Sequence, residues 1–293
     1  MPPRRRPQLG TLDGRFSEAY DINDQGRVVG TSLAADNRYH AVMWAEVTTR
    51  DPRGRKPPVR SWQITDLGVP GDGPYADARG INNTGAIVGR YTVGRGFESQ
   101  FQGSRGFLRR DDTITTLELD PGVQPFAVND SDQVVGLYRS TISSTSEITG
   151  RPFLWQNGTG RDLGTLGGST TPYALNNRTQ VVGEATIADG RTAGFVWQGG
   201  SIRQLPIDRP DYRDYLAVSI NDSGTIVGSA SGDTPSSRRA LLWSSPDARP
   251  QALAAPAGHT SVSASAVGPQ GWVVGEATRS TGTSTVQSVV VWR

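Results

Sequence analysis

The stretch from Ala78 to Gly89, ARGINNTGAIVG, decides the fold because close variants of it recur along the whole chain. Six segments follow the pattern Ala-x-x-(Ile/Val/Leu)-Asn-x-x-Gly-x-(Val/Ile)-Val-Gly or a near relative of it. They end at Gly30, Gly89, Gly136, Gly183, Gly228 and Gly275, at intervals of 59, 47, 47, 45 and 47 residues. A period in this range is typical of a four-stranded propeller blade. We therefore number six repeats by these glycines.

Each repeat contains four apolar bursts separated by turn residues. In the second repeat the expected strands are 78–83, 85–91, 106–110 and 113–119. Between the first two strands, Asn opens the turn and Gly takes the left-handed backbone conformation that such a turn requires. Asp132 and Thr179 replace this glycine in two repeats, and because a β-branched residue is costly at positive φ, we expect the Thr179 turn to differ.

The two ends of the chain are predicted to complete one blade together. The last repeat stops at Arg293, after its third strand, while residues 8–14 (QLGTLDG) match residues 162–168 (DLGTLGG), a fourth strand and its exit. Adding this segment to the last blade would close the ring and leave no open edge. We therefore expect one domain, residues 1–293, with an all-β fold: a six-bladed β-propeller of four antiparallel strands per blade, closed by the N-terminal strand.

The motifs resemble the HAF-repeat family, which is named for a His-Ala-Phe tripeptide at the start of the third strand. Residues 40–42 (His-Ala-Val) are the nearest match, and other repeats keep only the apolar part, such as residues 106–108 and 194–196. The resemblance covers nearly the whole chain. It implies a propeller-like repeat protein, commonly labelled extracellular, and carries no shared activity over to these residues.

The composition of the chain limits which bonds, partners and cellular locations can be expected. The chain has no cysteine and no apolar run of membrane-spanning length, so disulfides, thiolate metal sites and a membrane partner are not expected. Residues 1–6 are basic without a hydrophobic segment behind them, which predicts a cytoplasmic protein, or an extracellular one if a leader was removed. A monomer is expected.

Net charge is only +2 although 30 residues are Arg or Lys, so nucleic acid is not the expected partner. Two basic segments stand out, the tail at residues 1–7 with Arg4, Arg5 and Arg6, and the loop insertion at residues 50–60. They are predicted to emerge on one rim and to hold an anionic partner weakly. Composition favours instead a solvated loop and a frayed tail without a partner.

Aligning the repeats on their turn asparagine brings one uneven set of residues together. Three positions before that residue stand Tyr20, Arg79, Phe126, Tyr173, Val218 and Ser265; five positions before it stand Glu18, Asp77, Gln124, Thr171, Leu216 and Ser263. At these two positions the first four repeats each carry an aromatic or charged residue, whereas the last two carry only aliphatic residues or serine. Packing alone would favour equivalent residues, so the asymmetry favours a ligand site at the mouth of the central channel over core packing.

The candidate site residues follow from this alignment and from nearby loops. A carboxylate in an aromatic pocket can act near neutral pH, which makes Glu18, Asp77, Tyr20 and Tyr173 the predicted catalytic groups. The predicted ligand-binding residues are Arg79 and Phe126 from the alignment, Phe97 and Phe101 from the enlarged loop after Tyr91, and Tyr75, Tyr215, His40 and His259 from the loops entering the strands.

No cofactor or metal is predicted. The chain has two histidines, and the calcium-loop match beginning at Asp21 has Ser32 where the pattern needs Glu. Two functions stay open. One is a small-molecule site, with a cofactor-independent lyase, cyclase or isomerase as its catalytic form; the other is a non-catalytic scaffold that recognises a protein or a glycan.

Overall fold

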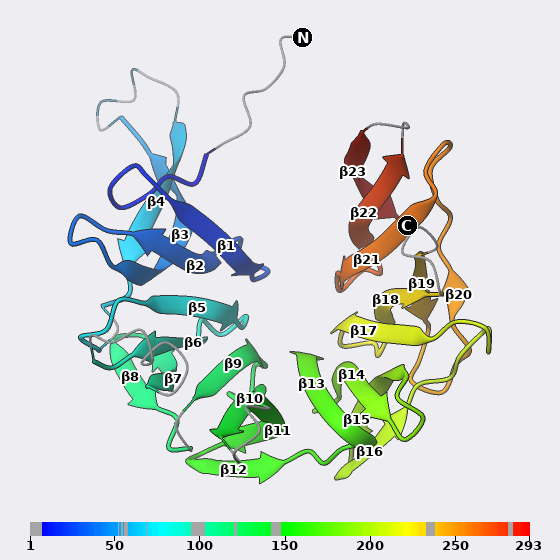
Figure 1. Ribbon diagram of the computed structural model, residues 1–293. Coiled ribbons are helices and arrows are strands. Elements are labelled where there is room, and N and C mark those ends of the chain that lie inside the picture. The colour runs from blue at the N-terminus through cyan, green and yellow to red at the C-terminus, as the bar shows by residue number, and fades with distance from the viewer. Residues whose placement is uncertain are drawn as a thin grey trace. The chain divides into compact units, whose positions relative to one another are not determined.

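The computed structural model describes residues 8–51, 53, 55, 58–68, 70–94, 103–119, 122–141, 148–232, 238–280 and 284–293. Every regular element in these ranges is a β-strand (Figure 1), which confirms the all-β prediction. None of the described segments is a helix that is long and apolar enough to span a membrane.

The first eight strands form two antiparallel sheets, each in the order of the sequence. One sheet contains β1 (Ser17–Ile22), β2 (Val28–Leu33), β3 (Tyr39–Thr49) and β4 (Val59–Asp66). The other contains β5 (Ala76–Ile81), β6 (Ile87–Thr92), β7 (Ser104–Arg110) and β8 (Thr113–Thr116).

The remaining strands form three further sheets. The first has the order β12-β11-β10-β9, with β9 (Val123–Val128), β10 (Val134–Thr141), β11 (Ile148–Gln156) and β12 (Thr159–Asp162). The second joins β13 (Gly167–Leu175), β14 (Val181–Ile187), β15 (Thr192–Gln198), β16 (Ser201–Gln204), β17 (Asp214–Ile220), β18 (Ile226–Ser231), β19 (Arg239–Trp243) and β20 (Gln251–Ala252). The third contains β21 (Ser261–Val267), β22 (Val273–Ser280) and β23 (Thr285–Trp292).

The blade count differs from the sequence-based one. Counting as a blade each sheet with at least four strands, the described residues show four blades rather than six. A single parallel bridge between Thr192 and Asp214 joins β15 to β17, so the strands of the fourth and fifth repeats form one eight-stranded sheet. The last sheet has only three strands because residues 8–13, predicted to supply its fourth, are not in a strand.

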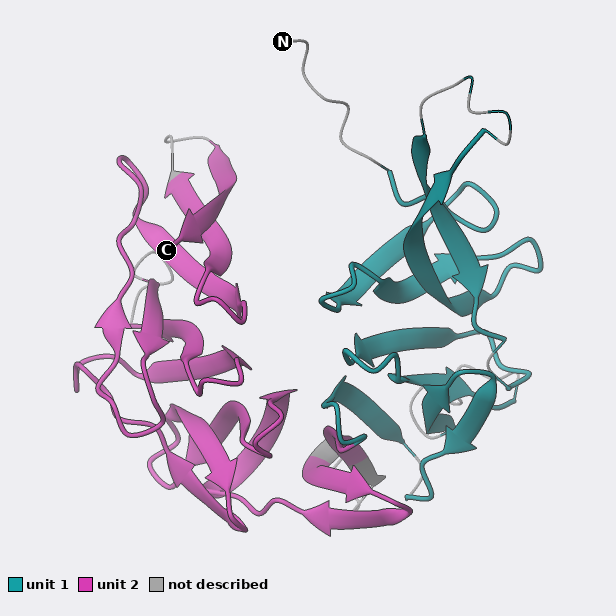
Figure 2. Ribbon diagram, turned by 180° about the vertical axis from the view of Figure 1, so that it is seen from behind, with its two compact units in different colours: residues 1–132 teal, residues 133–293 magenta. Residues whose placement is uncertain are grey.

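The chain divides into two compact units, residues 1–132 and residues 133–293 (Figure 2). The single-domain organisation expected from the sequence stays a prediction. Everything that follows is argued within one unit at a time, and the candidate site lies in the first.

The N-terminal segment packs on the first sheet instead of forming a strand. Leu9 and Leu12 contact the core of this sheet, and the carbonyl of Gly10 accepts a hydrogen bond from Nε1 of the buried Trp44, at 3.2 Å. In the second unit, Nε1 of Trp243 donates in the same way to the carbonyl of Pro206, at 2.8 Å. Pro206 follows β16, the fourth strand of its repeat, and the buried Leu205. The N-terminal segment therefore makes the tryptophan contact that residues after a fourth strand make at Trp243.

The repeated asparagine has a role that the sequence did not reveal. Its Oδ1 caps its own turn, as when Asn82 accepts from the backbone N–H of Ala86 at 2.7 Å, and its Nδ2 donates to a backbone carbonyl of the next repeat. The donations run from Asn23 to Asn82 (3.0 Å), Asn82 to Asn129 (2.8 Å), Asn176 to Asn221 (3.0 Å) and Asn221 to Gly268 (3.1 Å). One buried side chain thus pairs backbone N–H groups of its own turn and a backbone carbonyl of the next repeat.

The turn at Thr179 corrects a sequence-based expectation. Thr179 has φ 58° and its N–H bonds the carbonyl of Asn176 at 3.1 Å, the same geometry as the Gly26 turn with φ 72°. Its hydroxyl donates to Oε1 of Gln133 at 2.8 Å. That bond helps to offset the cost of positive φ in a β-branched residue, so the turn is retained.

Candidate functional site

A β-bulge in the first strand of the repeats positions the candidate residues. The pairing register shifts between Ala19 and Asp21 in β1 and between Ala78 and Gly80 in β5. The same shift occurs in β13, β17 and β21, which places the bulge at Tyr20, Arg79, Tyr173, Val218 and Ser265. These are the residues three positions before the turn asparagine. A bulge redirects a side chain out of the regular alternation, and bulges are frequent beside functional sites.

The glycine that ends each motif makes this bulge possible. A Cβ on Gly89 would overlap the carbonyl oxygen of Asp77 in β5, and a Cβ on Gly30 would overlap that of Glu18 in β1. The structure shows that the approaching backbone is the first strand of the same repeat, directly before its bulge.

Two guanidinium groups meet one buried carboxylate between β5 and β6. Asp77 is directly opposite Arg90 in the strand register, and Arg79 lies two residues further along β5 at the bulge. Nε of Arg79 donates to Oδ2 of Asp77 at 2.7 Å, and Nε of Arg90 reaches the same oxygen at 3.4 Å. The Asp77 side chain is 0% exposed, whereas Arg79 and Arg90 are 29% and 19% exposed. The carboxylate is therefore internal and its partners reach the surface.

The first strand of the first repeat completes the arrangement. The Arg79 guanidinium lies over the ring of Tyr20, 4.0 Å from the ring centroid. The Tyr20 hydroxyl donates to Oε2 of Glu18 at 2.9 Å. Cation–π stacking of this kind fixes the plane of the guanidinium as well as stabilising its charge.

Tyr75 flanks the second arginine, with its ring centroid 5.3 Å from the Arg90 guanidinium. Burial, followed by hydrogen bonding with Tyr75 and Glu18, raises the pKa of Tyr20, and burial raises the pKa of Tyr75. Both phenols stay protonated at neutral pH and serve as hydrogen-bond donors. We call the assembled set the arginine cluster; its members are Glu18, Tyr20, Tyr75, Asp77, Arg79 and Arg90.

The arginine cluster contains hydrogen-bonding groups without a partner. Each arginine donates to Asp77 through Nε. Within the described residues, the Nη groups of Arg79 and Arg90 make no hydrogen bond. Oδ1 of Asp77 is fully buried and also lacks a partner there. Buried polar atoms are nearly always paired, so an unpaired carboxylate oxygen beside free guanidinium groups is unusual for a purely structural network.

The other predicted site residues lie elsewhere. Tyr173 belongs to the second unit, where burial and a hydrogen bond with Glu184 raise its pKa. Phe126 is a partly buried residue of β9. Phe97 and Phe101 lie outside the described residues.

Tyr215 and His259, both predicted ligand-binding residues, have structural partners in the second unit. The buried Tyr215 hydroxyl donates to Oδ1 of Asp208 at 2.9 Å, and burial raises its pKa to about 12. Oδ2 of the same carboxylate accepts from Arg239 at 3.0 Å. Nδ1 of His259 lies 3.3 Å from the carbonyl of Ala257.

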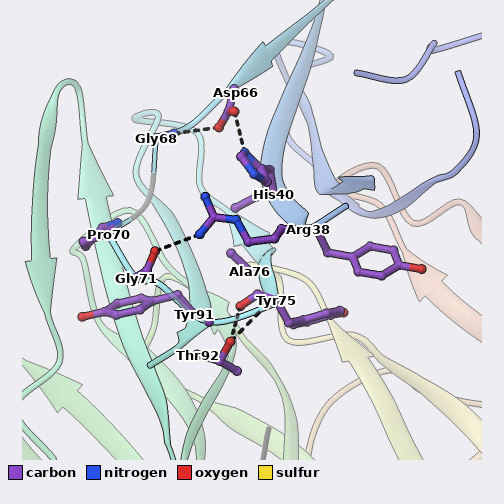
Figure 3. Close-up of a pocket in the computed structure, with 13 residues that line it drawn as sticks. Arg38, His40, Asp66, Gly68, Pro70, Gly71, Tyr75, Ala76, Tyr91 and Thr92 are labelled. Carbon is purple, nitrogen blue, oxygen red and sulfur yellow. Dashed lines mark hydrogen bonds and ion pairs between the residues drawn. The ribbon is translucent and has the colours of Figure 1, made fainter. Parts of the chain in front are cut away.

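His40 lines a separate open pocket of about 190 Å³ in the first unit (Figure 3). Nδ1 of His40 lies 2.7 Å from Oδ2 of Asp66, and its Nε2 lies 3.2 Å from Oδ2 of Asp36. Hydrogen bonding from Arg38 lowers the pKa of Asp36 to about 2. The sequence named His40 but missed these partners, because no local pattern brings Asp36 of a turn and Asp66 at the end of β4 to the same histidine.

Tyr75 also lines this pocket, so it is shared between the pocket and the arginine cluster. Its ring lies 5.5 Å from that of Tyr39, another lining residue. The described residues contain no group of three or more His, Cys, Asp or Glu side chains arranged to hold a metal ion.

The predicted basic segments are only partly described. Residues 1–7 lie outside the described residues, as do several positions of the 50–60 insertion. Within the insertion, Asp51 accepts from the backbone N–H groups of Arg53 and Arg55, and Arg60 lies 3.4 Å from Glu46. Weak binding of an anionic partner here stays a prediction.

No family model and no curated protein matches the chain. Among solved structures, TolB from Acinetobacter baumannii aligns with a TM-score of 0.52 at 12% identity, over 90% of this chain and 60% of that chain. The β-propeller domain of the Trilobed protease from Pyrococcus furiosus aligns at 0.45 and 11%, over 95% and 96% of the two chains. Pyrococcus horikoshii acylaminoacyl peptidase aligns at 0.49 and 14%, over 95% and 51%.

The fold is a β-propeller. The likeness to TolB supports this fold alone, because at 12% identity it says nothing about activity. The resemblance to HAF repeats stays a prediction from the sequence.

Proposed function

We propose that this protein binds a small molecule at the arginine cluster of its first unit. The observation that carries the proposal is the state of Asp77, a fully buried carboxylate that draws in two arginines whose Nη groups keep no partner among the described residues. A network that served stability alone would be expected to pair the buried Oδ1 of Asp77 internally. Free donors at the surface, held by a buried anchor, are the arrangement that a ligand would complete.

Binding is favoured over catalysis by the same geometry. Asp77, a predicted catalytic group, is enclosed by its arginines and has no exposed surface. The raised pKa of Tyr20 moves it away from the range in which a phenol acts as a base near neutral pH. Glu18 is exposed but is already bonded by the Tyr20 hydroxyl. We therefore assign Asp77 and Tyr20 to positioning the two arginines, and the arginines to holding the ligand.

The fifth repeat supplies a matched control for testing this proposal. Its residues at the positions of Asp77, Arg79 and Arg90 are Leu216, Val218 and Ser229, in the same register and with the same bulge. A triple variant, Asp77→Leu with Arg79→Val and Arg90→Ser, should therefore keep the fold of the second repeat while removing every charge between β5 and β6.

The experiment is a ligand-observed NMR screen of a small-molecule library that contains acids, amines and neutral compounds. We expect compounds that bind the wild type with millimolar or better affinity and lose at least about tenfold in affinity for the triple variant. Circular dichroism and thermal melting check that the variant is folded. A library whose binders all recognise both proteins equally would refute the proposal.

A further inference from the structure

The hydrogen-bonding capacity left in the arginine cluster points to a particular ligand chemistry. An arginine has five N–H donors, and Arg79 and Arg90 each direct Nε at Oδ2 of Asp77. The remaining four donors of each side chain are its two Nη groups, which have no partner in the described part of the chain. Two sets of planar donors, partly exposed and anchored at a common atom, present paired N–H groups to whatever lies in front of them.

Between β5 and β6, the charges next to these donors favour an anion. Between β5 and β6, two guanidinium cations face a single carboxylate, which leaves one positive charge in excess. The guanidinium carbons of Arg79 and Arg90 lie over the rings of Tyr20 and Tyr75, 4.0 and 5.3 Å from the ring centroids, and both arginine side chains stay partly exposed. Paired N–H donors at the edge of a guanidinium match the two oxygens of a carboxylate.

Glu18 decides between a singly and a doubly charged anion. Its carboxylate bonds the hydroxyl of Tyr20, whose ring carries the Arg79 guanidinium, so a negative charge already stands beside the donors. A phosphate dianion would meet about twice the repulsion from this charge that a carboxylate meets. With Glu18 counted, the arginine cluster carries two positive and two negative charges, so a bound monoanion leaves one unbalanced negative charge and a phosphate dianion leaves two, which favours the monoanion.

We infer that the ligand of the arginine cluster is a carboxylic acid whose carboxylate is held by the Nη groups of Arg79 and Arg90. This inference rests on the proposed function and adds the chemical class of the ligand. Asp77 is a positioning residue in this arrangement, since it orients both arginines without contacting the ligand. Tyr20 and Tyr75 provide flanking surface for the body of the acid.

The test uses matched pairs of acids and their carboxamides, namely acetate with acetamide, benzoate with benzamide, and phenylacetate with phenylacetamide, together with inorganic phosphate. Affinities are measured by titration NMR on the full chain at low salt and neutral pH. We expect at least one acid to bind at least about tenfold more tightly than its carboxamide and than phosphate, because only the carboxylate accepts charge-assisted hydrogen bonds at both oxygens.

Glu18→Gln gives a readout that a structural role would not move. Removing this charge should tighten binding of the acid by about twofold to tenfold at low salt and leave the carboxamide unchanged, and added salt should erase the gain. Glu46→Gln is the matched control, an exposed glutamate in β3 that lies outside the arginine cluster and should change neither affinity. Arg90→Gln should weaken acid binding by at least about tenfold.

The outcomes separate the inference from the function beneath it. Carboxamides that bind as well as the acids, with both lost in the triple variant, would overturn the carboxylate assignment and leave the proposed function standing. Tighter binding of phosphate, or weaker acid binding in Glu18→Gln, would overturn it as well. Failure of every acid to bind, together with a library screen in which no binder depends on the cluster, would overturn both.

Discussion

The second and fifth repeats have the same backbone and opposite chemistry. In β5 and β6, Asp77 pairs with Arg90, Ala78 with Gly89 and Gly80 with Val88; in β17 and β18, Leu216 pairs with Ser229, Ala217 with Gly228 and Ser219 with Val227. Both first strands carry a bulge at the same place. The fold therefore requires the small residues and the bulge, but it does not require charge. The ion pairs of the second repeat need another explanation, which the proposed ligand would supply.

The largest effect should come from breaking the charge balance that only the second repeat has. Asp77→Leu alone leaves Arg79 and Arg90 without their shared anion, and we expect it to lower the free energy of unfolding by about 3 kcal/mol at pH 7. The triple variant that copies the fifth repeat should lose no more than about 1 kcal/mol, because no charge is left unpaired. Urea unfolding followed by circular dichroism measures both. Equal losses in the two variants would show that charge balance is not the reason.

The next effect tests what the two repeats share. A Cβ on Gly89 or Gly228 would overlap the carbonyl oxygen of Asp77 or Leu216, which is backbone that cannot easily move. We expect Gly89→Ala and Gly228→Ala each to cost about 2–3 kcal/mol, despite the different side chains around them. Gly268→Ala serves as the control, since its nearest neighbour would be 3.8 Å away. Thermal denaturation gives the comparison, and a mild effect at either of the first two glycines would contradict the overlap.

Sequence comparison went furthest where the structure keeps strict register. Aligning the repeats on their asparagine found Glu18, Tyr20, Asp77 and Arg79 together, because these residues hold fixed places relative to one bulge. Arg90 was missed since it sits in the second strand, and pairing it with Asp77 requires knowing where the bulge falls. The signal was available, because Arg90 directly follows the motif glycine Gly89.

Other parts of the structure had no comparable signal in one sequence. The contact of His40 in β3 with Asp36 and Asp66 depends on the turn before β3 and on the pairing of β3 with β4, whose connecting insertion no repeat pattern predicts. The placement of residues 8–13 was misread because the segment resembles a strand exit in sequence. In the structure it packs on Trp44 of the first sheet without forming a strand. The blade count failed because one parallel bridge and one missing strand do not alter the repeat.

A third prediction compares how two repeats reach a backbone N–H of the next repeat. Oδ2 of Asp21 accepts from the N–H of Ile81 at 2.9 Å, and at the equivalent place the hydroxyl of Ser219 accepts from the N–H of Val267 at 3.2 Å. Burial raises the pKa of Asp21 to about 6. A carboxyl whose pKa is raised on folding stabilises the fold fully below its unfolded pKa of about 3.9 and loses that contribution as pH rises through the folded value.

The first unit should therefore gain on the order of 2 kcal/mol from Asp21 as the pH falls from 7 to 4. Asp21→Ser, which copies the fifth repeat, should remove this part of the pH dependence. Chemical denaturation of wild type and variant across this range, with the difference taken at each pH, isolates the contribution of this one group. Parallel curves for the two proteins would show that Asp21 does not titrate in this window.

The smallest effect concerns the shared asparagines. Asn82→Ala removes the donation to Asn129 and the cap on its own turn, and Asn221→Ala removes the same two kinds of bond in the fifth repeat. We expect each to cost about 1–2 kcal/mol, with no difference between charged and uncharged repeats. Thermal melting of the two variants side by side is sufficient. A clear difference in stability loss between the two variants would mean that the arginine cluster also stabilises the contact between repeats.

The asparagine bonds also give the array a direction. Each one runs from a side chain to a main-chain carbonyl, so the acceptor can be any residue, including Gly268, which has no side chain to donate onward. A repeat of this kind depends on the backbone of its successor and is indifferent to that successor's sequence. Repeats can therefore diverge in their other side chains without losing this bond, and the described series of side-chain bonds stops where glycine stands in the place of asparagine.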